Sequence, residues 1–144
     1  MSFINQTLDA MVDLLSLGDA LTMEKCLSIM SIESQPTDRR IMPSGHLVAI
    51  GVLAGRHQVQ FMAVPDLRKG MAYLMFKAAL PLQGDLASQI AYPGMKITAA
   101  PDGRNRHISF AFRGYNAGLI IDSHPEALKG VFCEAENAWA PSGQ

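Results

Sequence analysis

The sequence contains few of the residues from which metal and redox centres are usually assembled. Its two cysteines, Cys26 and Cys133, stand in unrelated segments, and no two of its four histidines have H-x-x-x-H spacing. Structural zinc needs four ligands, and the chain offers no local pair of ligands with which such a site would begin. We therefore expect no metal ion and no cofactor, and we expect both cysteines to be reduced, buried thiols.

Sequence motifs of nucleophilic catalysis and of phosphate binding are also missing. No G-x-S-x-G motif is present, and Cys133 is followed by Glu134, whose charge disfavours a thiolate. Gly51 and Gly55 fall within an expected β-hairpin, where glycine serves turns and bulges rather than a phosphate loop. These absences favour a protein that is not an enzyme, although they leave the question open.

Long apolar runs and an excess of one charge are lacking as well. No window approaches the 18 uninterrupted apolar residues of a membrane span, and the first residues lack the basic region of a signal peptide. We therefore expect a soluble, cytoplasmic protein. The net charge is −1, which gives no electrostatic reason to expect nucleic acid or a membrane as a partner. Charged residues make up 17%, against about 25% in average proteins, and the resulting apolar surface favours a protein partner or a homodimer.

The first third of the chain predicts helices followed by a loop. The spacing of apolar residues over 4–15 is that of an amphipathic helix, with Ser2 as its N-cap and Gly18 just beyond its end. Residues 20–32 fit a helix or a strand, and a helix is favoured over 20–30. Residues 34–45 contain two prolines and several turn formers, which predicts a flexible loop.

The remaining two thirds predict an antiparallel sheet and further helices. One hairpin is expected from 46–64 around Gly55-Arg56, a second from 95–112 around Asp102-Gly103, and one more strand at 118–122. Helices are expected over 66–80, over 85–91, and from an S-x-x-E capping box at Ser123 to about residue 138, before a tail at 141–144. We therefore predict a single α+β domain over 1–144. Its antiparallel sheet would be built from two hairpins and packed by N-terminal, central and C-terminal helices.

Basic residues are concentrated on the second hairpin. Arg104, Arg106 and His107 follow its turn, and Arg113 stands at its far end. Clustered arginines can bind a carboxylate or phosphate through paired hydrogen bonds, which makes a small anionic-ligand sensor one hypothesis. The alternative is a solvated hairpin tip whose charges prevent pairing with other chains.

Three runs of the sequence, at residues 3–15, 44–76 and 84–92, together resemble the CheX/CheC-like chemotaxis phosphatase family. This resemblance implies an α+β fold, paired domains and dephosphorylation of an aspartyl phosphate on a response regulator. In that family a Glu docks the partner and an Asn orients the attacking water. Here Asp85 stands in place of the Glu and Ser88 in place of the Asn. Aspartate is one methylene shorter and serine has no amide, so the resemblance implies the fold rather than the activity.

The leading interpretation is a non-enzymatic binding module that recognises a protein partner, of secretion-chaperone, immunity or anti-defence type. The alternatives are a divergent response-regulator phosphatase acting through Asp85 and Ser88, and the anionic-ligand sensor.

Overall fold

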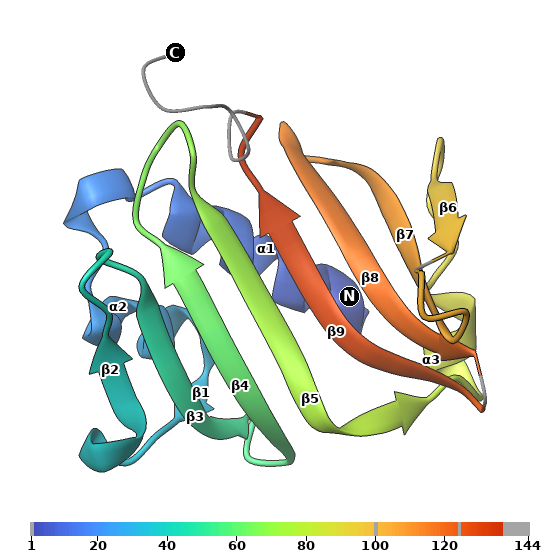
Figure 1. The fold of residues 1–144 in the computed structure, drawn as a ribbon, viewed down its shortest axis with the longest axis horizontal. Helices are drawn as coiled ribbons and strands as arrows, with labels where there is room; N and C mark the ends of the chain where they lie inside the picture. The colour runs from blue at the N-terminus through green and yellow to red at the C-terminus, as the bar shows by residue number, and fades with distance from the viewer. Residues whose placement is uncertain (1, 100, 124, 137–144) are drawn as a thin grey trace.

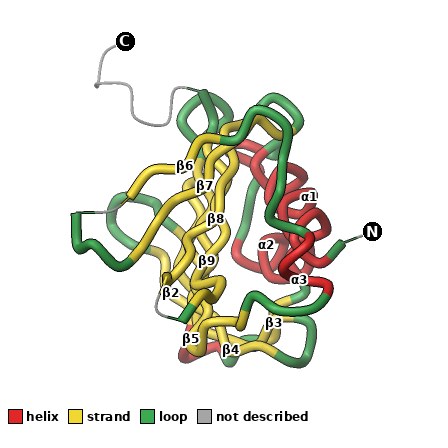
Figure 2. Tube along the Cα trace, turned by 90° about the vertical axis from the view of Figure 1, so that its right-hand side faces the viewer, coloured by secondary structure: helices red, strands yellow, loops and turns green. Residues whose placement is uncertain are grey.

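One large antiparallel sheet forms the body of the protein. In a computed structural model that describes residues 2–99, 101–123 and 125–136, nine strands form this sheet and three helices lie on one side of it (Figures 1 and 2). The elements are α1 (Phe3–Leu15), α2 (Met23–Met30), β1 (Ile32–Glu33), β2 (Arg39–Ile41), β3 (Leu47–Leu53), β4 (His57–Val64), β5 (Met71–Pro81), α3 (Asp85–Ser88), β6 (Lys96–Ala99), β7 (Asn105–Phe112), β8 (Tyr115–Ser123) and β9 (Glu126–Glu134).

The two N-terminal helices confirm the helical interpretation of the first thirty residues. The Ser2 hydroxyl accepts a hydrogen bond from the Asn5 N–H at 3.1 Å, which satisfies one of the free donors at the start of α1. Thr22 caps α2 in the same way, through the N–H of Lys25. The apolar stripe of α1 is completely buried against the sheet.

The strand order places the last strand of the chain in the middle of the sheet. The order is β1-β3-β4-β5-β9-β8-β7-β6, and β2 also pairs with β3. The chain runs inward from one edge through β3, β4 and β5, crosses past α3 to the far edge at β6, and returns through β7 and β8 to β9 in the middle (Figure 1). The hairpins β3–β4 and β6–β7 confirm the two hairpins expected from the sequence. Inward side chains of these strands and of α1 and α2 form the core.

The central helix expected over 66–80 is wrong, because these residues form a turn and then β5. The Asp66 carboxylate accepts from the N–H groups of Arg68 at 2.8 Å and Lys69 at 2.9 Å, and these hydrogen bonds close a turn instead of starting a helix. The turn ends at Gly70, where a Cβ would lie 2.3 Å from the Asp66 carbonyl oxygen. Only a residue without a side chain permits this close approach, after which the chain enters the sheet.

The C-terminal helix expected from Ser123 is also wrong, because this segment is β9. Ser123 and Glu126 pair across the β8–β9 hairpin, so the S-x-x-E spacing belongs to a tight turn rather than to a capping box. A shift in the pairing of β9 with β8 leaves Lys129 as one extra residue in β9. Such a bulge interrupts the alternation of inward and outward side chains, which is the usual signal of a strand.

The predicted fold class must therefore be corrected. The expected central and C-terminal helices are strands, so the sheet is not packed by helices from three parts of the chain. The two longer helices, α1 and α2, are N-terminal, and α3 has four residues within the range expected for a short helix. Residues 34–45, expected to be a loop, contain a 3₁₀ turn at Pro36–Asp38 and β2. The expected tail at 141–144 lies outside the described residues. Within the part of the chain that is described, no helix is long and apolar enough to cross a membrane.

Candidate binding face

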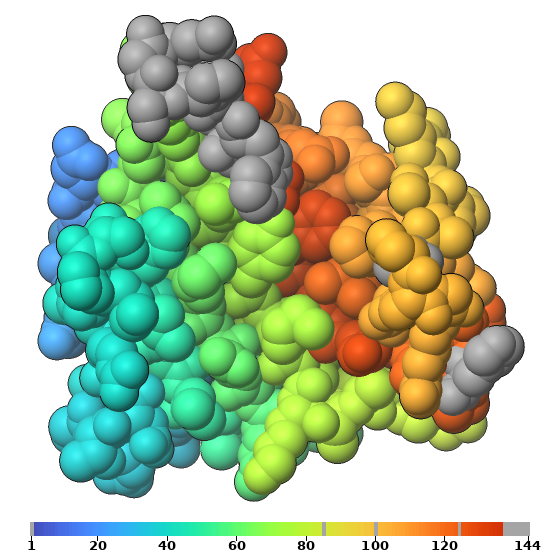
Figure 3. Space-filling model, in the orientation of Figure 1, coloured from blue at the N-terminus to red at the C-terminus, as the bar shows by residue number. Residues whose placement is uncertain are grey.

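The sheet has a second face, on the side away from the helices, which we call the open face (Figures 2 and 3). Its side chains form rows that run across the strands. One row is composed of Val48, Met62, Tyr73 and Phe132, and the next of Ile50, Gln60, Met75, Gly130, Ile120 and His107. Most of these side chains are apolar, and Ile50 is 56% exposed. The centre of the open face is therefore more apolar than the outer side of a sheet that faces water.

Two glycines in the middle of the sheet let large neighbours lie flat on the open face. A Cβ on Gly118 of β8 would lie 2.2 Å from Cζ of Phe132, and one on Gly130 of β9 would lie 2.5 Å from Sδ of Met75. Phe132 therefore extends across β8, and Met75 extends across β9 towards Ile120. The bare backbone of each glycine creates the space that the neighbouring side chain fills.

The first hollow on the open face, which we call the Glu134 pocket, lies over β5, β9, β8, β7 and β6. Its volume is about 350 Å³. It is lined by Tyr73, Thr98, His107, Ser109, Asn116, Ile120, Phe132 and Glu134. Six of these eight residues come from the last three strands, β7 to β9, so this pocket depends on the insertion of β9 into the centre of the sheet.

The side of the Glu134 pocket formed by β5 and β9 combines a buried carboxylate with stacked aromatic rings. Glu134 is only 6% exposed, and its carboxylate accepts a hydrogen bond from the Tyr73 hydroxyl. Burial, and then the neighbouring carboxylate, raise the pKa of Tyr73 well above its usual value, so the phenol stays protonated as a donor. The Tyr73 and Phe132 rings stack with centroids 5.5 Å apart, and His107 lies 6.2 Å from Phe132.

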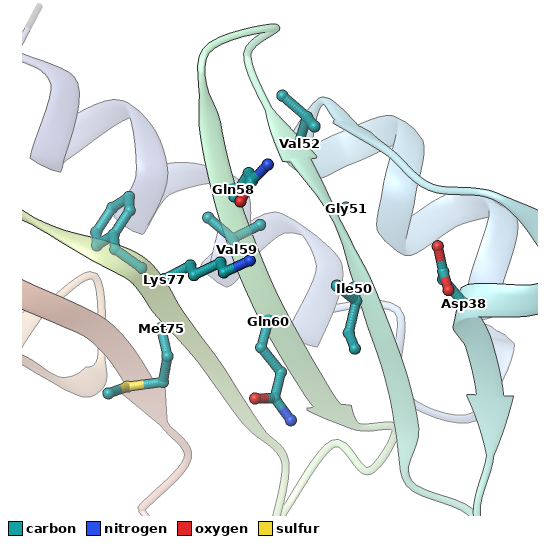
Figure 4. A pocket seen from close by; sticks show the side chains of 10 residues that line it. Asp38, Ile50, Gly51, Val52, Gln58, Val59, Gln60, Met75 and Lys77 are labelled. Carbon is teal, nitrogen blue, oxygen red and sulfur yellow. The ribbon is translucent and has the colours of Figure 1, made fainter.

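The second hollow, the Met75 groove, lies over β3, β4 and β5 and has a volume of about 490 Å³. Figure 4 shows Ile50, Gln60 and Met75 projecting from adjacent strands, with Asp38 on the β2 side and Lys77 extending from β5 towards β4. Met75 faces the Met75 groove, and it also extends over Gly130 towards Ile120 of the Glu134 pocket. The two hollows are therefore neighbours on one continuous face.

The basic residues singled out in the sequence do not gather into one site. Arg104 pairs with Asp122 at 3.0 Å, and Arg106 pairs with Glu126 at 2.6 Å. Arg113, at the far end of β7, bonds to two carboxylates of α1, with its nearest contact 3.0 Å from Asp9.

Arg106 and His107 are consecutive residues of a strand, so they project to opposite faces, and only His107 reaches the open face. The structure thus uses Arg104, Arg106 and Arg113 in ion pairs with the protein's own carboxylates.

The two residues that the family resemblance singles out lie on α3. Asp85 begins this helix, although its side chain is outside the described part of the structure, and Ser88 is exposed at its end. Figure 2 places α3 on the helical side of the sheet, so neither residue belongs to the open face.

The two cysteines are free and completely buried, as the sequence predicted. Burial raises the pKa of each thiol to about 12, which keeps both in the unreactive protonated form at neutral pH. Among the described residues, no three His, Cys, Asp or Glu side chains are placed to hold a metal ion.

Sequence reasoning missed the open face and, in it, Tyr73, Glu134, Phe132 and Met75 as a group. Tyr73 and Glu134 are 61 residues apart, and nothing local connects them. The available signal was the alternation around Tyr73: Ala72, Leu74 and Phe76 point into the core, while Tyr73 and Met75 point outward.

Fold and face together define a class of protein: a single antiparallel sheet with helices on one side and a largely apolar face, containing two hollows, on the other. No family model, curated protein or solved structure matches the chain. The resemblance to the CheX/CheC-like family therefore stays a prediction.

Proposed function

We propose that this chain is a non-enzymatic binding module that recognises a protein partner through the open face. The observation that carries the proposal is the apolar surface of that face, where two hollows adjoin and Ile50, on β3, is 56% exposed. Contiguous apolar surface of this kind marks interaction sites in soluble proteins. The proposed function is recognition of a protein partner, of the type performed by secretion chaperones, immunity proteins or anti-defence proteins.

The side chains of the open face suit a protein surface as partner. Met62, Met71 and Met75 project from β4 and β5, and methionine adapts its shape to different apolar partners. Tyr73 and Phe132 supply rigid aromatic area, which is enriched at the centres of protein interfaces. We place this binding in the cytoplasm, because both cysteines are free thiols and reducing compartments maintain thiols in that state.

The test compares an open-face variant with a matched variant elsewhere. Ile50→Glu places a charge in the Met75 groove, and Leu67→Glu places one at a site of similar exposure, 62%, in the turn after β4. Each tagged protein is used to capture partners from its native cells, and its own mass in solution is measured by sedimentation. We expect wild type and Leu67→Glu to bind the same protein and Ile50→Glu to lose it.

A dimer that Ile50→Glu dissociates would identify a second copy of the chain as the partner. A monomer that captures nothing, or a partner that all three proteins bind equally, would refute the proposal.

A further inference from the structure

We propose that the partner of the open face is a second copy of this chain, and that the open faces of the two copies stack so that their sheets form a sandwich. This inference rests on the proposed function, because it names the partner that the open face recognises. The charge, the shape and the area of the face each support it.

The centre of the open face is uncharged, which suits contact between identical surfaces (Figure 3). From β3 to β8, the two rows of side chains described above consist of uncharged residues, and Glu134, one row away, is only 6% exposed. In a two-fold dimer both copies use the same patch, so a charge at its centre would meet a like charge or lose its water. Exposed charges stand at the border instead, at Arg40, Lys77 and Lys96. A neutral centre gives an oppositely charged protein nothing to recognise, whereas it fits a copy of itself.

The shape of the centre suits a stacked sheet. Gly118 and Gly130 carry no side chain, so Phe132 and Met75 lie over them and form a low surface. Sheets that face each other pack about 10 Å apart, and the side chains of each fit between those of the other. Ile50, at 56%, is the most exposed large apolar residue of the two rows. In the stacked pair, the hollows of one copy receive the Ile50 side chain of the other.

The area of the open face is sufficient for a stable dimer. Six neighbouring strands, from β3 to β7 in the order of the sheet, span about 29 Å at the usual strand spacing. β4 and β7 have 8 residues each, which corresponds to about 27 Å along the strands. The face therefore offers about 800 Å² per copy, which is the contribution of each partner to an interface of standard size.

The test measures the mass of the full chain by sedimentation in a reducing buffer. Protein concentrations run from about 1 to about 100 μM, because interfaces of this area have micromolar or tighter affinity. We expect a dimer and no larger species, since the stack occupies the open face of both copies. Added salt should leave the dimer unchanged or strengthen it, because salt screens the basic side chains at the two borders from one another.

Two charge substitutions on the open face are compared with matched substitutions elsewhere. Ile50→Glu and Gln60→Glu each place a carboxylate in the contact, and each should raise the Kd of the dimer at least about hundredfold, because an unpaired charge is costly to bury. Gln60 is exposed, so its substitution decides the question if Ile50→Glu fails to fold. The controls are Leu67→Glu, in the turn after β4, and Gln83→Glu, in the loop before α3. Neither control should change the Kd more than about twofold.

One more variant separates stacking of faces from pairing of edges. The backbone of an edge strand such as β6 is another place where two copies can join, and a charge on the edge opposes such pairing. Ile97 of β6 is 59% exposed, and it pairs with Ile108, whose side chain is in the core, so Ile97 is not part of the open face. Ile97→Glu should therefore leave the dimer intact. A dimer that Ile97→Glu dissociates and Ile50→Glu does not would overturn the inference.

A monomer at every concentration, or a dimer that both Ile50→Glu and Gln60→Glu leave intact, would also overturn it. A dimer that salt dissociates would contradict the neutral contact. If the wild type is a monomer but captures a different protein that Ile50→Glu loses, the proposed function stands and this inference falls. If neither a dimer nor a captured protein is found, both fall.

Discussion

Replacing Gly118 by alanine should destabilise the protein through one identifiable clash. The new Cβ would lie 2.2 Å from Cζ of Phe132, so the ring must retreat by at least 1.2 Å to reach the 3.4 Å of ordinary contact. The Cβ would also lie 2.8 Å from the carbonyl oxygen of Ile108. Overpacking of this kind costs about 1–3 kcal/mol, against which alanine in a strand recovers about 0.5–1 kcal/mol of backbone entropy.

The matched control for this prediction is Gly130→Ala. It meets a backbone oxygen, that of Leu74, at the same 2.8 Å, but its side-chain neighbour is Sδ of Met75 at 2.5 Å. A methionine end swings away at little cost, whereas the Phe132 ring is stacked on Tyr73 and moves as a rigid unit. Gly118→Ala should therefore lose about 2 kcal/mol and Gly130→Ala less than about 1 kcal/mol.

Urea unfolding of both variants measures these costs from the shift of the midpoint at constant m-value. Phe132→Leu should cost less in the Gly118→Ala background than in wild type, because the shorter side chain relieves the clash. Equal losses for the two glycine variants, or additive effects of Gly118→Ala and Phe132→Leu, would refute the packing argument.

Two further predictions concern α1 and the cysteines. Ser2→Ala should lower the free energy of unfolding by about 1 kcal/mol because it removes the N-cap bond to Asn5. Ser16→Ala, at the other end of the helix, should cost clearly less in the same urea titration, and a neutral Ser2→Ala would contradict the capping role. Cys26 and Cys133 should not react with a thiol reagent at pH 8 until the protein unfolds, and rapid labelling of the folded protein would contradict their burial. Folding raises both pKa values to about 12, so their contribution to stability is complete below about pH 9 and is lost as the pH rises towards 12.

The N-terminal helices and two of the hairpins were predictable because their signals are local. Ser2 and Thr22 mark the two helix starts by hydrogen bonds that span three residues. Asp102 forms the turn before β7 by accepting from the N–H groups of Arg104 and Asn105 at 2.8 and 2.9 Å. Contacts of this range can be inferred from the order of residues alone.

The residues of β5 and β9 misled the prediction for different physical reasons. In β5 both faces carry apolar side chains, since Leu74 is in the core and Met75 lies on the open face. Such a run also matches helical spacing, and periodicity cannot separate the two. In β9 the bulge at Lys129 shifts the inward positions by one, which gives Leu128 and Val131 the spacing of a helix face.

The sequence by itself determined the elements whose signals lie within a few residues, namely the capped helices and the hairpins β3–β4 and β6–β7. Its sparse use of cysteine also predicted two thiols without a disulfide. Tertiary structure alone decided that β9 enters the sheet between β5 and β8. That insertion brings Tyr73 to Glu134 across 61 residues of chain and completes the open face. The physical reason is that strands are stabilised by partners distant in sequence, whereas caps and turns are stabilised by neighbours.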